Sequence, residues 1–166
     1  CRWLSLVVFF VDSYVPDADA HISIRQRFSQ EGIMFEQVKP GLVGEREMKV
    51  EVENTAKHLG SGNVSVLATP EMVRLMEGAA VRAVDHLLPD GYRTVGIRVD
   101  VRHLAATPLG MTVRAKATLL EVDGRKLTFH VEAFDESEKI GEGIHERMII
   151  DVAKFSQRVE SKQGQP

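Results

Sequence analysis

The chain has 166 residues, of which 43% are hydrophobic, and this length and composition are typical of one domain with its own core. The net charge is −3 and the pI about 6.1, and no cluster of lysine and arginine with interleaved aromatics occurs, which argues against nucleic-acid binding. The single cysteine, Cys1, excludes an internal disulfide framework and any cysteine-based zinc site. No apolar run approaches the roughly 20 residues that a membrane-spanning helix needs.

The two ends of the chain differ in pattern from the rest. Residues 3–11 form an apolar run, and Ala18-Asp19-Ala20 weakly resembles a signal cleavage site. Our preferred interpretation is that Met34 is the natural start and that residues 1–33 are a disordered upstream extension, with an export signal as the alternative. We expect one domain over residues 34–157 and a disordered tail over residues 158–166.

A strand and a helix are the first predicted elements after Met34. Met48, Val50 and Val52 alternate with charged residues, which indicates a half-buried strand. After a short apolar run over residues 63–68, Thr69-Pro70-Glu71 offers an N-cap, a proline at the first helical position and an acid in the first turn. The helix is expected to continue to about Leu88. Its apolar arc would hold Met72, Val73, Met76, Ala79, Ala80, Ala83, Val84 and Leu87.

Long alternating strands follow the helix. Residues 94–103 would place Val95, Ile97, Val99, Val101 and His103 on one face. Residues 111–122, the strand that returns from the turn at residues 123–124, and a last strand over about 142–151 alternate similarly. One long helix followed by an antiparallel meander predicts an α+β protein whose sheet wraps around the helix, which is the hotdog fold. Edge strands with few protective features also predict a homodimer.

Three polar side chains point towards apolar space. Thr69 stands at the start of the helix, Glu77 lies beside its apolar arc, and His103 closes an apolar strand. Because a buried polar group without a partner is costly, the three mark a candidate site. Each also has a structural interpretation: an N-cap, one side of an ion pair, and a hydrogen-bonded core histidine. No array of aspartate and histidine has metal-ligand spacing, so we expect no metal.

A series of short motifs resembles a known family. In order they are Ala68-Thr69-Pro70, Met76-Glu77, Val95-Gly96, His103-Leu104-Ala105-Ala106-Thr107-Pro108, Val122-Asp123-Gly124-Arg125, Ile140-Gly141-Glu142-Gly143 and His145-Glu146-Arg147. Together, over residues 41–157, they resemble the fluoroacetyl-CoA thioesterase family of hotdog proteins. The resemblance implies that Thr69, Glu77 and His103 are catalytic. It also implies that the Gly96 N–H faces the thioester carbonyl and that Arg147 lies near the catalytic threonine.

The activity implied by the resemblance is hydrolysis of acyl-CoA thioesters by a cytoplasmic dimer, with coenzyme A entering only as part of the substrate. His103 could act as base or acid, because its ordinary pKa lies near neutrality. Glu77 could attack the thioester or activate water, and Arg147 could pair with Glu77 or hold Thr69. A non-catalytic acyl-CoA-binding module is the alternative. A hotdog hydratase is less favoured, because the chain has no aspartate–histidine pair at the short spacing that such enzymes use.

The segment before Thr69 departs from the family pattern. The family's fluoroacetate-specific enzyme has a longer segment there, with phenylalanines that form a hydrophobic lid. Here residues 58–63 are short and contain no aromatic residue. We therefore expect a broader or different short acyl-CoA substrate.

Overall fold

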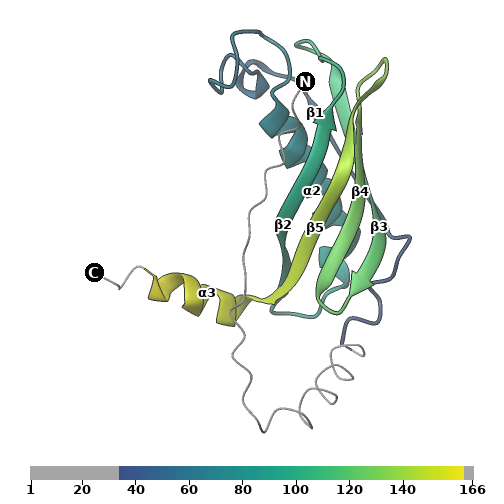
Figure 1. Cartoon of the computed structure of the whole chain (residues 1–166), viewed down its shortest axis with the longest axis vertical. Coiled ribbons are helices and arrows are strands. Elements are labelled where there is room, and N and C mark those ends of the chain that lie inside the picture. The colour runs from purple at the N-terminus through teal and green to yellow at the C-terminus, as the bar shows by residue number, and fades with distance from the viewer. Residues whose placement is uncertain (1–33, 163–166) are drawn as a thin grey trace, which may run out of the picture.

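A five-stranded antiparallel sheet curls around one long helix in the computed structural model, which describes residues 34–162 (Figure 1). The predicted extension, residues 1–33, and residues 163–166 lie outside the described part. The order across the sheet is β1-β3-β4-β5-β2, so β1 and β2 are its edges. The strands are β1 (Val43–Lys49), β2 (Tyr92–His103), β3 (Thr112–Asp123), β4 (Lys126–Phe134) and β5 (Lys139–Asp151). This architecture confirms the predicted α+β hotdog fold.

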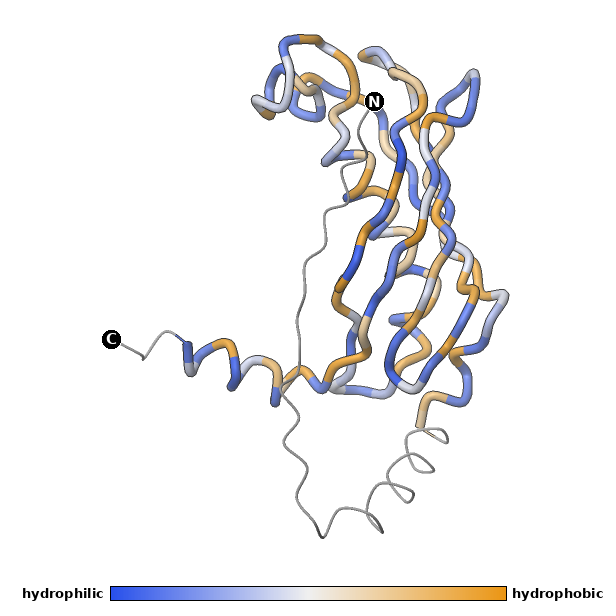
Figure 2. Tube along the Cα trace, viewed as in Figure 1, coloured by the Kyte–Doolittle hydropathy of each residue, from blue (hydrophilic) through white to orange (hydrophobic). Residues whose placement is uncertain are grey.

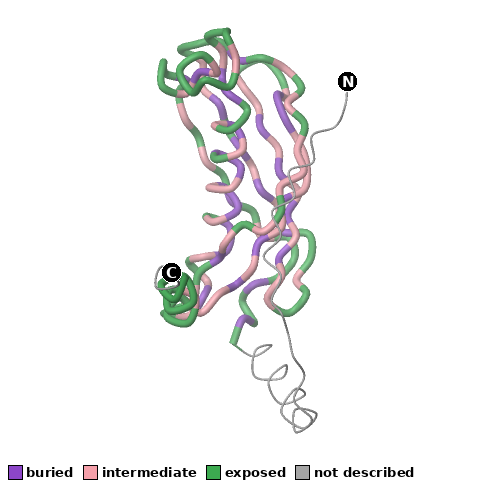
Figure 3. Tube along the Cα trace, turned by 60° about the vertical axis from the view of Figure 1, so that its left-hand side comes forward, coloured by how far each residue is buried: buried purple, intermediate pink, exposed green. Residues whose placement is uncertain are grey.

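The core lies between the sheet and the helix α2 (Thr69–Val84), which continues as a 3-10 turn, η2 (Asp85–Leu87). Strand alternation is visible along the tube in Figure 2, and the buried residues gather between helix and sheet in Figure 3. Burying these apolar faces against each other is the main force that holds the two layers together. On the helix the buried residues are Met72, Leu75, Met76, Ala79, Ala80, Ala83 and Val84, and on β3 and β4 they are Val113, Ala115, Ala117, Leu119, Leu127, Phe129, Val131 and Ala133.

The start of α2 differs from the sequence-based prediction. Ala68 is the N-cap residue, without a side-chain capping bond, and Thr69 is already helical. The interpretation of Thr69 as an N-cap is therefore wrong, and its hydroxyl is available for another partner. The helix also ends earlier than Leu88, because Asp85 turns towards β2 and accepts hydrogen bonds from the backbone N–H and the hydroxyl of Thr94.

A β-bulge in β2 overturns the prediction that one face of this strand holds all its aliphatic residues. Gly96 pairs with Arg147 on β5 and Arg98 pairs with Glu146, so Ile97 is an extra residue between them. An extra residue reverses the alternation of side chains beyond it. Thr94 and Gly96 therefore share the inner face with Val99, Val101 and His103, while Val95 and Ile97 do not.

The end of the first strand and the start of the C-terminal tail also differ from the sequence-based expectation. The strand predicted over residues 48–52 ends at Lys49, and Val52 begins a 3-10 turn, η1 (Val52–Asn54), in which it is exposed. After β5 the chain forms a helix, α3 (Val152–Ser161), which extends into the segment expected to be disordered (Figure 1). Within residues 34–162, no helix is long and apolar enough to cross a membrane.

Candidate functional site

Thr69 and His103 meet at the point where α2 begins and β2 ends. The Thr69 hydroxyl oxygen lies 2.9 Å from Nδ1 of His103. Backbone contacts hold the two segments together, because the N–H of Leu67 donates to the carbonyl of Thr107 and Val66 pairs with Pro108. The structure thus brings together two of the three candidate residues, although they are far apart in the sequence.

The environment of His103 favours a neutral imidazole. Burial lowers the pKa of His103, and a backbone hydrogen bond involving Ala105 acts in the opposite direction. Its Nε2 atom is buried and has no hydrogen-bond partner among the described residues. A neutral ring with Nδ1 against a hydroxyl is suited to accept a proton at pH 7.

Glu77 lies on the flank of α2 that faces β2, with its side chain 38% exposed. Its Oε1 atom is 3.8 Å from Nε2 of His145. Gly96 leaves the space that this carboxylate occupies, because a Cβ atom at Gly96 would stand only 2.7 Å from Oε1. Gly96 thus has a positional role that the sequence did not reveal, and its expected contact with a thioester carbonyl stays a prediction.

Within one protomer, Glu77 is remote from the Thr69–His103 pair. Eight residues of α-helix separate Thr69 from Glu77, a rise of about 12 Å. Seven residues of β2 separate Gly96, which lies beside Glu77, from His103, a path of about 20 Å. The structure therefore does not bring the third candidate residue to the other two.

Within residues 34–162, Arg147 makes no hydrogen bond with Glu77 or Thr69, the two partners expected from the sequence. Its Nε donates to the hydroxyl of Thr94 and its Nη2 to the carbonyl of Thr94, both at 2.8 Å. Its Nη1 lies 3.1 Å from Nε2 of His145. Burial lowers the pKa of Arg147, while the negative charges of Asp85 and Glu77 act in the opposite direction. Arg147 therefore belongs to a buried polar network beneath Gly96.

His145 and Thr94 are functional candidates that sequence reasoning missed. His145 is 1% exposed, and burial lowers its pKa to about 4, with the charge of Arg147 contributing. The sequence did contain a signal. His145, Arg147 and Ile149 occupy every second position of β5 and therefore share one face, so both polar side chains had to point inward with Ile149. Thr94 was hidden by the bulge, which reverses the alternation of β2.

The loop before Thr69 is short and closed by backbone hydrogen bonds. The N–H of Ala56 donates to Val66 and that of Lys57 to Val64, and Thr55 pairs with Leu67, two residues before Thr69. It exposes two aliphatic side chains, Leu59 and Val64.

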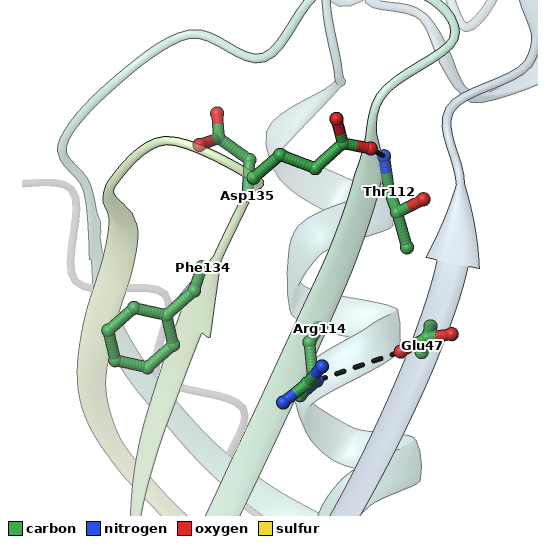
Figure 4. A pocket seen from close by; sticks show the side chains of 6 residues that line it. Glu47, Thr112, Arg114, Phe134 and Asp135 are labelled. Carbon is green, nitrogen blue, oxygen red and sulfur yellow. Dashed lines mark hydrogen bonds and ion pairs between the residues drawn. The ribbon is translucent and has the colours of Figure 1, made fainter.

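A hollow of about 250 Å³ lies on the sheet near its β1 edge (Figure 4). Arg114 and Glu47 form an ion pair of 3.6 Å there, and Glu136 accepts a hydrogen bond from the Thr112 N–H. Its lining, completed by Phe134 and Asp135, holds three carboxylates and none of the candidate residues, which does not suit the anionic coenzyme A. Within residues 34–162, no group of three or more His, Cys, Asp and Glu side chains is arranged to hold a metal ion.

Comparison with known proteins decides the family. Residues 50–153 match the family described as fluoroacetyl-CoA-specific thioesterase, FlK. The chain belongs to this family. It is 40% identical over 135 residues to the fluoroacetyl-CoA thioesterase of Streptantibioticus cattleyicolor, a match that covers 75% of this chain and 97% of the relative.

Solved structures agree with this assignment. A structure of the fluoroacetyl-CoA thioesterase FlK superposes with a TM-score of 0.71 at 37% identity, covering 78% of this chain and 98% of the other. A thioesterase superfamily member from Thermus thermophilus gives 0.70 at 31% identity, covering 76% and 96%. A hot-dog-like protein from Thermanaerovibrio acidaminovorans gives 0.72 at 27% identity, covering 79% and 97%. The predicted family, hotdog fold and thioester hydrolase activity are confirmed.

Proposed function

We propose that this chain hydrolyses small acyl-CoA thioesters to the free acid and coenzyme A, with Thr69, Glu77 and His103 as catalytic residues. The observation that carries the proposal is the 2.9 Å contact between the Thr69 hydroxyl and Nδ1 of His103 at the start of α2. A hydroxyl beside a neutral imidazole is a typical arrangement for proton transfer in acyl transfer. The N-terminus of α2 adds a partial positive charge that favours a developing oxyanion.

In the proposed reaction, His103 moves a proton between Thr69 or water and the leaving thiolate. Glu77 supplies a carboxylate, either as a nucleophile that forms a transient anhydride or as a base that activates water. The two roles differ in where the oxygen of water enters. Recovery of ¹⁸O in the Glu77 side chain after turnover in H₂¹⁸O would establish the nucleophilic role, with water attacking the glutamyl carbonyl of the anhydride. Trapping of an acylated Glu77 by hydroxylamine would establish the same role if water attacks the acyl carbonyl, and the absence of both signals would favour the water-activating role.

We further propose that a homodimer completes the site. β2 is a twelve-residue open edge on which Val99 and Val101 are only half-buried. Val73 and Val81 flank Glu77 on the adjacent helix face and are also half-buried. A second copy that pairs along β2 covers this face and hides the edge. Since Thr69 and Glu77 of one chain are about 12 Å apart along α2, the Thr69–His103 pair of one protomer would act with the partner subunit's Glu77.

A small acyl group is the substrate that the loop before Thr69 favours. Fluoroacetyl-CoA thioesterases are relatives of this chain, and its loop before Thr69 exposes Leu59 and Val64 and contains no aromatic residue. Aliphatic side chains distinguish acyl groups mainly by size, since one methylene is worth about 1–3 kcal/mol in such a pocket. We therefore propose activity on several short acyl-CoAs, fluoroacetyl-CoA among them.

Because coenzyme A thioesters are metabolites of the cell interior, we also propose a cytoplasmic location.

The test is release of free thiol by the full chain from a panel of acyl-CoAs, from acetyl and fluoroacetyl to medium-chain and phenylacetyl. We expect release that decreases with acyl length and falls by at least about 100-fold in His103→Ala, the scale of a general base. His130→Ala is the matched control, because His130 is partly exposed on the outer face of β4. Light scattering should give the mass of a dimer. Tight binding of acyl-CoA without thiol release would instead support the non-catalytic binding module.

A further inference from the structure

The polar network under Gly96 is built around a histidine that the proposed reaction does not use. His145 is fully buried on the inner face of β5, between the backbone of Arg98 and the guanidinium of Arg147. Buried polar side chains are retained where their bonds orient something else. Glu77 is the group within reach, 3.8 Å from Nε2 of His145.

The two contacts of the His145 ring fix its protonation. Nδ1 lies 2.8 Å from the carbonyl oxygen of Arg98, which only accepts, so Nδ1 carries the proton. Nε2 lies 3.1 Å from Nη1 of Arg147, which only donates, so Nε2 offers its lone pair. His145 is therefore a neutral ring in one tautomer, and it cannot donate a hydrogen bond from Nε2 to Glu77.

The guanidinium of Arg147 is held at all three of its nitrogens. Nε and Nη2 donate to the hydroxyl and carbonyl oxygens of Thr94, and Nη1 donates to His145. The Thr94 hydroxyl in turn donates to Asp85 at 2.5 Å. Within residues 34–162, His145 is the only hydrogen-bond partner of Nη1, the guanidinium nitrogen on the side of Gly96.

Arg147 and Glu77 converge on the space above Gly96. The point where a Gly96 Cβ would stand is 2.7 Å from Oε1 of Glu77 and 3.8 Å from Nη1 of Arg147. The negative charge of Glu77 acts on the buried guanidinium and raises the pKa of Arg147, against the larger effect of burial. The position of the Nη1 arm therefore influences where the Glu77 carboxylate rests.

We propose that His145 is a positioning residue, whose neutral ring accepts from Arg147 and so fixes the guanidinium that holds the Glu77 carboxylate above Gly96. This inference rests on the proposed function, since it gives Glu77 its place for the reaction. His145 itself would touch no substrate and would act only through Arg147. A histidine suits this position because its neutral ring offers a donor to Arg98 on one side and an acceptor to Arg147 on the other.

Two substitutions test the two hydrogen bonds of the His145 ring separately. In His145→Gln, the side-chain oxygen can take the place of Nε2 and accept from Arg147. In His145→Asn, the amide can take the place of Nδ1 and donate to Arg98, but the side chain is too short to reach Arg147. We expect the Gln variant to keep kcat within about threefold of the wild type, and the Asn variant to lose at least about tenfold in kcat with KM unchanged.

A spectroscopic measurement makes the test independent of turnover. In ¹⁵N NMR of the full chain near neutral pH, we expect the wild-type His145 ring to show the neutral tautomer with hydrogen on Nδ1. The Arg147 side-chain N–H signals should be protected from exchange in the wild type and in the Gln variant, and lose protection in the Asn variant. A protonated ring, or Arg147 signals that are equal in both variants, would overturn the proposal even if the enzyme were inactive.

The kinetic measurements distinguish a failure of the positioning role of His145 from a failure of the proposed thioesterase function. Wild-type protein that releases no thiol would contradict the proposed function alone. Active wild-type protein with equal losses of kcat in the Asn and Gln variants would contradict the positioning role alone, since a purely structural loss has no reason to spare the Gln variant.

Discussion

Replacing Gly96 by alanine is the sharpest single change that the structure offers. The new Cβ atom would stand 2.7 Å from Oε1 of Glu77 and 3.1 Å from Cε1 of His145, whereas ordinary contacts begin near 3.4 Å. The His145 ring is 1% exposed and packed among other side chains, so it has little room to retreat. The half-exposed Glu77 side chain is the group that can move.

The size of the effect follows from these distances. Glu77 has to retreat by about 0.7 Å to restore a normal contact, and a misplacement of about 1 Å at a reacting group can cost about 100-fold in rate. We therefore expect Gly96→Ala to lower kcat by roughly 10- to 100-fold. Because the carboxylate can swing towards solvent, the loss of unfolding free energy should be small for an overpacked site, about 1 kcal/mol.

The assay is thiol release at saturating acyl-CoA, together with urea unfolding of the same samples. Gly62→Ala serves as the control for stability, because a Cβ atom at Gly62 would meet only the side chain of Ala56 at an ordinary 3.5 Å. Wild-type kcat in the Gly96→Ala protein would refute the reasoning, since it would mean that the position of Glu77 above this strand does not matter for the reaction.

Three further changes test other parts of the account. Gly44→Ala should cost about 3 kcal/mol in urea unfolding, because its Cβ would overlap the backbone carbonyl of Ala79 on α2; a loss below about 1 kcal/mol would contradict this close packing. Because His103 is proposed to act as a neutral base, kcat/KM should fall with decreasing pH through a pKa below the ordinary value of 6.5, and a midpoint above that value would contradict it. Burial lowers the pKa of His145 to about 4 in the folded protein, whereas the unfolded residue has the ordinary pKa of about 6.5. The contribution of His145 to the free energy of unfolding should therefore be fully present above pH 6.5 and decrease by about 3 kcal/mol towards pH 4. Unfolding curves across this range should lose that component in His145→Gln, and an identical pH dependence in both proteins would count against the buried neutral ring.

The sequence predicted the fold well because its signals are local. Alternation in the strands and the apolar arc of the helix follow from periods of 2 and 3.6 residues, and the turn at residues 123–124 follows from Asp-Gly. The bulge at Ile97 could not be predicted, because it depends on how β2 registers against β5. One extra residue then moved Thr94 to the inner face and Val95 away from it.

The geometry of the candidate site could be predicted only in part. Thr69 lies in contact with His103, although a threonine before a proline equally suggests an N-cap. Backbone hydrogen bonds from residues 67–68 to distant segments fix where the helix begins, and so which of the two roles Thr69 takes. Glu77 lies apart from both, because its eight-residue separation from Thr69 places it two turns along the helix. The surroundings of Arg147 depend on β2, on β5 and on the end of the helix at Asp85 at once, which no local pattern encodes.

Mixing two inactive proteins tests the central claim, a thioesterase whose site is shared between protomers, most directly. Glu77→Gln and His103→Ala proteins would be combined, allowed to exchange subunits, and assayed for thiol release from a short acyl-CoA. Random re-pairing makes about half of the dimers mixed, each with one intact site, so activity should return to about a quarter of the wild-type value. Activity that stays at the level of the separate variants would contradict the shared site, and an active Glu77→Gln protein on its own would contradict the role of Glu77.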